Sequence, residues 1–71
     1  MNFRCTISNI DDDSRRYLMG IIDGMRARDV VMTPDTIEFA TGGTNMALLV
    51  DLHQREILRC DISYGRITNT I

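Results

Sequence analysis

The apolar residues of this chain change their spacing along the sequence, and this change restricts the fold to one that combines strands with a helix. Phe3, Cys5 and Ile7 alternate with polar residues, which is the period of two expected of a half-buried strand. We therefore predict a first strand over residues 2–9. Both cysteines, Cys5 and Cys60, lie in strand-like runs and are expected to be small buried apolar residues rather than a disulfide.

The next segment has the spacing of an amphipathic helix. Asp11, Asp12 and Asp13 precede it, and acidic side chains accept hydrogen bonds from the free N–H groups of a helix start and favour the positive end of its dipole. We expect Asp12 or Asp11 to cap the helix, which should run to about Arg28. Its apolar stripe spans about 140° of arc and consists of Tyr17, Leu18, Ile21, Ile22 and Met25.

Strand patterns dominate the remaining sequence. Residues 30–32 are apolar and mostly β-branched and residues 37–40 alternate, and together with Thr33-Pro34-Asp35 as the turn between them they predict a hairpin. Residues 46–52 are almost continuously apolar and residues 57–64 alternate again, so they are predicted to form a central hairpin, with 66–71 as a last strand. In the expected register the helix-facing residues Met46, Leu48, Val50 and Leu52 lie opposite Tyr64, Ile62, Cys60 and Leu58.

A second interpretation concerns residues 45–59, which contain many strong helix formers and would make a second helix capped by Thr44. We favour the strand interpretation. The predicted fold class is α+β, in a single domain over residues 1–71: one amphipathic helix on one face of a four- or five-stranded, mainly antiparallel sheet, in the order β-α-β-β-β-β.

The face of this sheet away from the helix is expected to be open, because one helix covers only one face. The predicted register places charged side chains there beside two apolar ones, Leu49 and Ile57. Protein interfaces concentrate arginine and apolar anchors. We therefore expect a partner-binding surface made of Arg4, Leu49, Asp51, Arg55, Ile57, Arg59 and Asp61.

The side of the helix opposite its apolar stripe is lined by small residues. Gly20 and Gly24 are four positions apart, and each glycine costs about 1 kcal/mol relative to alanine inside a helix. Such a face lets another backbone approach closely. We predict a second interface on this side, made of Arg16, Met19, Gly20, Asp23, Gly24 and Ala27.

Composition limits the classes of partner. The 71 residues carry a net charge of −2, which argues against a protein whose affinity comes from neutralising phosphates. All eight basic residues are arginine, whose planar fork binds carboxylate or phosphate at two points. No run approaches the roughly 18 apolar residues of a membrane span, and the first residues lack the apolar core of a signal peptide. We expect a cytoplasmic protein without a membrane partner.

Residues with catalytic or metal-binding chemistry are few. His53, Cys5 and Cys60 are the only soft metal ligands and lack the paired spacing of a zinc site. His53 is expected in or beside a loop while the cysteines point into the core, so they do not form a nucleophile and base. We predict no enzyme activity, no metal and no cofactor.

These observations favour a small protein-binding module, an adaptor, inhibitor or modulator of a larger complex. Its partner would be another protein or a second copy in a homodimer, and its size suits a protein encoded by a phage or another mobile element. The alternative is a nucleic-acid-binding regulatory protein that uses the arginine-bearing sheet face. Nucleic acid is the less favoured partner, because sheet-based binders stack bases on aromatic rings, whereas Phe3, Phe39 and Tyr64 are predicted to face inward.

Overall fold

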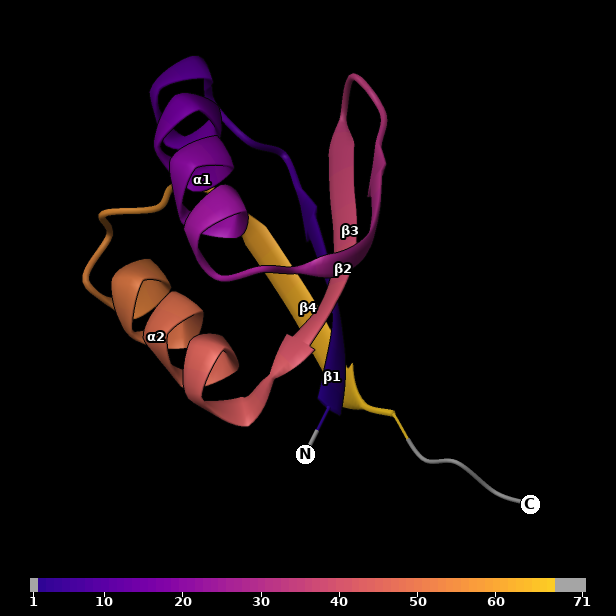
Figure 1. Ribbon diagram of the computed structural model, residues 1–71. Helices are drawn as coiled ribbons and strands as arrows, with labels where there is room; N and C mark the ends of the chain where they lie inside the picture. The colour runs from indigo at the N-terminus through magenta and orange to yellow at the C-terminus, as the bar shows by residue number, and fades with distance from the viewer. Residues whose placement is uncertain (1, 68–71) are drawn as a thin grey trace.

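A four-stranded antiparallel sheet with both helices on one face forms the fold, as the computed structural model, which describes residues 2–67, shows (Figure 1). In chain order the elements are β1 (Asn2–Ser8), α1 (Asp12–Gly24), β2 (Arg28–Met32), β3 (Thr36–Gly42), α2 (Gly43–Gln54) and β4 (Asp61–Arg66). The strands lie in the order β2-β3-β1-β4. Strands β2 and β4 are therefore the two edges of the sheet.

The connections between strands explain why two helices are needed. Strand β1 is antiparallel to both of its neighbours, β3 and β4, so β3 and β4 run in the same direction. Strands that run in the same direction require a long crossover, and α2 supplies it between β3 and β4. Helix α1 does the same between β1 and β2, with β3 inserted between them. This is the split β-α-β arrangement of ferredoxin-like folds, which host many unrelated functions.

The core lies between the helices and the inner face of the sheet. Each helix contributes two fully or almost fully buried apolar residues, and the alternate residues of β1 and β3 pack against them. The buried cluster consists of Cys5, Ile7, Leu18, Ile22, Ile37, Phe39, Met46, Leu49 and Leu58.

Several sequence predictions are confirmed. The α+β class, the antiparallel sheet, the first strand and the hairpin of β2 and β3 all agree with the structure. Asp11 is the cap of α1, and its carboxylate accepts a hydrogen bond from the Ser14 N–H at 2.7 Å. Two details differ: α1 ends at Gly24, before Arg26 takes a positive φ of 55°, and Tyr17 of the predicted stripe is 50% exposed.

The predicted strand over residues 46–52 is wrong, because this segment lies in α2. The second interpretation, a helix in this region, is confirmed in kind, although α2 begins at Gly43 and its cap is Gly42 rather than Thr44. An almost continuous apolar run fits both periods and does not decide between them. The buried residues Met46 and Leu49 are three positions apart, and Leu48 between them is half exposed. This spacing of buried residues is that of a helix.

The end of the chain also differs from the prediction. Strand β4 begins at Asp61, later than the predicted strand over residues 57–64, because a loop follows α2. Of the last predicted strand over residues 66–71, Arg66 completes β4 and the Ile67 N–H donates a hydrogen bond to the Asn2 carbonyl oxygen at 2.9 Å. Residues 68–71 lie outside the described part of the chain.

Candidate interaction groove between α1 and β2

A groove of about 710 Å³ lies between α1 and the edge strand β2. Four residues predicted for the helix-face interface line it, and sequence reasoning missed the other four. The lining residues are Met19, Gly20, Ile22, Asp23, Arg26, Ala27, Val30 and Met32. The groove is thus an apolar surface with one acidic and one basic side chain.

The two glycines of α1 are exposed, and neither is required by the local backbone. A Cβ atom built on Gly20 or Gly24 would meet no atom within 4 Å, and neither residue has a positive φ. Close packing against the rest of the chain therefore does not explain them. Gly20 lies inside the helix and on the groove, so its side of α1 presents bare backbone.

The strand on the other side of the groove exposes three consecutive apolar residues. Val30, Val31 and Met32 are 38%, 49% and 45% exposed. Val30 and Met32 line the groove, while Val31 pairs with Glu38 on the opposite face of the sheet. The bulge between Arg28 and Val31 inserts one extra residue on β2, so Arg28 pairs with Ala40 on the open face of the sheet although Val30 and Met32 line the groove.

Two anchors outside the groove hold α1 and β2 in place. The Arg15 guanidinium donates hydrogen bonds to the carbonyl oxygens of Thr33 and Pro34, at 3.2 and 3.3 Å, and so ties the start of α1 to the β2–β3 turn. Arg28 Nη2 donates to Asn2 Oδ1 at 2.9 Å, which draws this side chain along the sheet. Arg16, the remaining charged residue of the predicted helix-face set, is exposed on α1 and does not line the groove.

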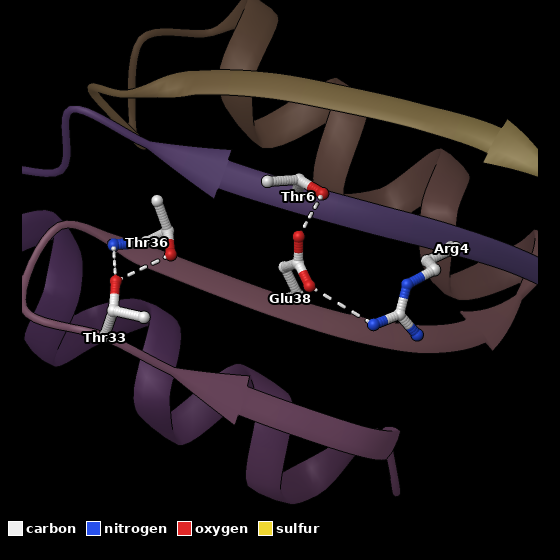
Figure 2. A network of polar contacts seen from close by, with 5 residues as sticks. All are labelled: Arg4, Thr6, Thr33, Thr36 and Glu38. Atoms are coloured by element: carbon white, nitrogen blue, oxygen red, sulfur yellow. Dashed lines mark hydrogen bonds and ion pairs between the residues drawn. The ribbon is translucent and has the colours of Figure 1, made fainter.

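The open face of the sheet is polar, and the surface predicted there does not assemble. Arg4 lies on it as expected, with Nη2 3.2 Å from Glu38 Oε2, and Thr6 Oγ1 donates to Glu38 Oε1 at 3.4 Å (Figure 2). Asp61 lies on the same face, where it accepts a hydrogen bond from the Asn9 side chain. The register of β1, β3 and β4 places no aromatic residue on this face within residues 2–67.

The other residues predicted for the open face lie elsewhere, because they belong to α2 and the loop after it. Leu49 is fully buried in the core, so its expected exposure is wrong. Asp51 and Arg55 form an ion pair along α2, with Arg55 Nε 3.1 Å from Asp51 Oδ2. Ile57 is 47% exposed in the loop. Arg59 Nε is 3.2 Å from Asp11 Oδ2 rather than opposite Asp51.

A second, smaller groove of about 480 Å³ lies beside α2, near the other edge of the sheet. Phe3 and Tyr64 stand there edge to face, with ring centroids 6.1 Å apart. Tyr64 is on the helix side, as predicted, yet half exposed. Asp51 and Gln54 also line this groove.

The structure places Cys5 in the core and brings His53 next to the backbone of Cys60. Burial, with a smaller effect from Cys60, raises the pKa of the Cys5 thiol to about 12. Burial also raises the pKa of Cys60, followed by the negative charges of Asp61 and Asp11. His53 Nε2 lies 2.8 Å from the backbone carbonyl oxygen of Cys60. Both thiols are therefore protonated near neutral pH, and the described residues contain no cluster of three metal-ligating side chains.

Comparisons with known proteins add no identification: no family model, no curated protein and no solved structure matches this chain. Within residues 2–67, neither helix has the length and apolar character needed to cross a membrane.

Proposed function

We propose that this chain is a small protein-binding module whose contact surface is the groove between α1 and β2. The observation that carries the proposal is the groove itself, in which exposed apolar side chains of Met19, Val30 and Met32 lie beside the bare backbone of Gly20. Exposed apolar surface of this kind marks interaction sites. The chain would act as an adaptor, inhibitor or modulator of a larger complex.

The glycines support this choice of surface over the open sheet face. Alanine at Gly20 would stabilise the helix by about 1 kcal/mol, and the structure has room for its methyl group. Glycine at position 20 is explained, despite this loss of stability, if the backbone of a partner must approach α1 closely. The open face offers no comparable apolar surface, because Arg4, Thr6 and Glu38 satisfy one another there.

The same face gives little support to nucleic-acid binding. Proteins that bind single strands on a sheet stack bases on aromatic side chains, and this face has none in the described residues. Its Arg4 is paired with Glu38, and the chain carries a net charge of −2. We expect no affinity for single- or double-stranded nucleic acid in a low-salt titration.

The test is affinity capture from a lysate of the native host with three versions of the chain. Gly20→Leu fills the groove with a side chain, and Gly65→Leu is the matched control, because Gly65 also has open space around its Cβ position but lies on β4. A protein retained by the wild type and Gly65→Leu, and lost with Gly20→Leu, is the expected result. Retention by Gly20→Leu, or capture of nothing by any version, would overturn the proposal.

A further inference from the structure

Two oppositely charged residues of α1 have no ion pair within the described part of their own chain. Arg16 and Asp23 are exposed, and the ion pairs within residues 2–67 join other residues. They are seven positions apart, which is about two helical turns, so both side chains extend from the same side of α1. Met19, which is 37% exposed, and Gly20 lie midway between them. This side of α1 therefore presents an unpaired charge toward each end and bare backbone in the middle.

A helix fits this surface better than a strand does. Strand β2, on the other side of the groove, is short, contains the bulge between Arg28 and Val31, and has a positive φ of 52° at Asp29. Short strands and bulges protect a sheet edge from pairing with another strand. The contact is therefore left to α1.

This side of α1 is complementary to itself when two copies lie antiparallel. We infer that α1 pairs with α1 of a second copy in this way, an inference that rests on the proposed role of Gly20 as the point where a partner's backbone approaches. A two-fold axis between Met19 and Gly20 places Arg16 of each copy opposite Asp23 of the other, because both residues lie about 5 Å along the helix from the midpoint. The two ion pairs are equivalent, as the symmetry of a homodimer requires.

The other charges near α1 agree with this register. The start of one helix lies beside the end of the other, so Asp13 of each copy lies near Arg26 of the other, which follows the end of α1. No like charges are level with one another along the two helices. A parallel pair would instead place Arg16 beside Arg16 and Asp23 beside Asp23, and like charges that face each other weaken association.

Gly20 sets how closely the two helices approach. Axes of packed helices are about 8 to 10 Å apart, depending on the side chains at the contact, and Gly20 beside Gly20 of the second copy allows the lower end of this range. The two-fold axis is perpendicular to both helices and passes between them, so its rotation keeps each side chain on its own side of the helix pair. Met19 therefore lies next to Met19 of the second copy, on the side where α1 borders the groove. Both grooves open on this side of the dimer.

The first test measures self-association of the whole chain by sedimentation equilibrium at low salt. We expect the mass of two chains for the wild type. Arg16→Asp and Asp23→Arg each oppose like charges at both ends of the contact and should weaken association by about 10-fold or more. Asp35→Arg changes the net charge as much as Asp23→Arg does, but it lies in the exposed β2–β3 turn and should associate like the wild type. A wild type that stays monomeric up to about 1 mM overturns the inference, as do charge reversals in α1 that have no effect.

The register is tested by reversing both charges. Arg16→Asp together with Asp23→Arg in one chain restores opposite charges at both ends of the contact. An equimolar mixture of the two single variants restores them as well, in a dimer of one chain of each. Both samples should regain the association of the wild type, with far-UV spectra unchanged. Samples that associate as weakly as the single variants contradict the register.

A third measurement uses the wild type alone and remains valid even if a variant fails to fold. Salt screens ion pairs between exposed charges, and the screening length falls from about 10 Å at 0.1 M to about 3 Å at 1 M. The dimer should therefore dissociate more readily in about 1 M than in about 0.1 M sodium chloride. Association that is equally tight or tighter at high salt contradicts a contact held by Arg16 and Asp23.

These results separate the two proposals. A monomeric chain that still captures a different protein through the groove supports the proposed function and overturns the second copy. A dimer that responds to the charge reversals as expected and captures no other protein supports the second copy and removes the adaptor role.

Discussion

The buried hydroxyl of Ser14, in the first turn of α1, accepts a hydrogen bond from the backbone N–H of Arg59 at 2.9 Å. Ser14 and Arg59 are 45 positions apart, so this contact joins the start of α1 to the loop that leads into β4. The Arg59 side chain strengthens the same junction through its ion pair with Asp11. Arg59, which the sequence analysis expected to bind a partner, is therefore held by contacts within its own chain.

Ser14→Ala should lower the free energy of unfolding by about 1 to 3 kcal/mol, because it leaves the Arg59 N–H without its partner. The measurement is urea denaturation, with an unchanged slope m and a lower midpoint. Ser63→Ala is the matched control, since Ser63 is exposed on the open face, and should change stability by no more than about 0.5 kcal/mol. Equal effects of the two substitutions would contradict the structural role of Ser14.

The junction also makes stability depend on pH. The pKa of Asp11 is lowered from its ordinary value of 3.8, first by the hydrogen bond from the Ser14 backbone, then by the Ser14 side chain and the charge of Arg59. A lowered pKa in the folded state means that Asp11 stabilises the fold above pH 3.8, and that this contribution is lost as the pH falls through the folded-state pKa.

Asp11→Asn isolates this contribution, because asparagine caps a helix about as well as aspartate but does not titrate. Thermal melts from about pH 6 to about pH 2 should show a smaller fall in melting temperature for Asp11→Asn than for the wild type. Asp35→Asn, in the exposed β2–β3 turn, serves as the control and should follow the wild type. Parallel curves for Asp11→Asn and the wild type would contradict the prediction.

The sequence predicted those parts of the fold in which the spacing of apolar residues fits either a strand or a helix, but not both. Phe3, Cys5 and Ile7 alternate without ambiguity, and the turn at Thr33 is specified locally, where the Thr33 hydroxyl accepts the Thr36 N–H at 2.9 Å (Figure 2). The apolar run in residues 46–52 fits a strand and a helix equally. The need for a crossover between β3 and β4 decides for the helix, and that need exists only once β4 pairs with β1.

The same dependence on the spacing of apolar residues explains why the residues of the predicted helix-face interface lie mostly together and those of the predicted open-face surface do not. Met19, Gly20 and Asp23 lie on one side of α1, whose period was evident from the sequence, and they line one groove together with Ala27, which lies between α1 and β2. Leu49, Asp51, Arg55 and Arg59 depended on the register of a hairpin that does not form, so that surface is dispersed. Val30 and Met32 were predicted in a strand but missed as groove residues, although the β-branched run that begins directly after the predicted helix placed that strand close to the helix end.

Gly20→Ala should raise the free energy of unfolding by about 1 kcal/mol, because it removes the entropic cost of glycine inside α1 and its Cβ meets no other atom within 4 Å. For a domain of this size the melting temperature should rise by roughly 4 to 8 °C. The same variant should bind less well at the groove. A gain in stability together with a loss of association would show that the glycine serves contact rather than folding.

Neighbouring leucines provide the sharpest check on α2. Leu49 is fully buried and Leu48 is 50% exposed, whereas a strand with the predicted register would bury Leu48 and expose Leu49. Leu49→Ala should cost about 2 to 5 kcal/mol, a large part of the roughly 4 to 11 kcal/mol expected for 71 residues. Leu48→Ala should change stability by no more than about 0.5 kcal/mol. Urea denaturation of the two variants compares them directly, and the reverse order of effects would place this segment back in the sheet.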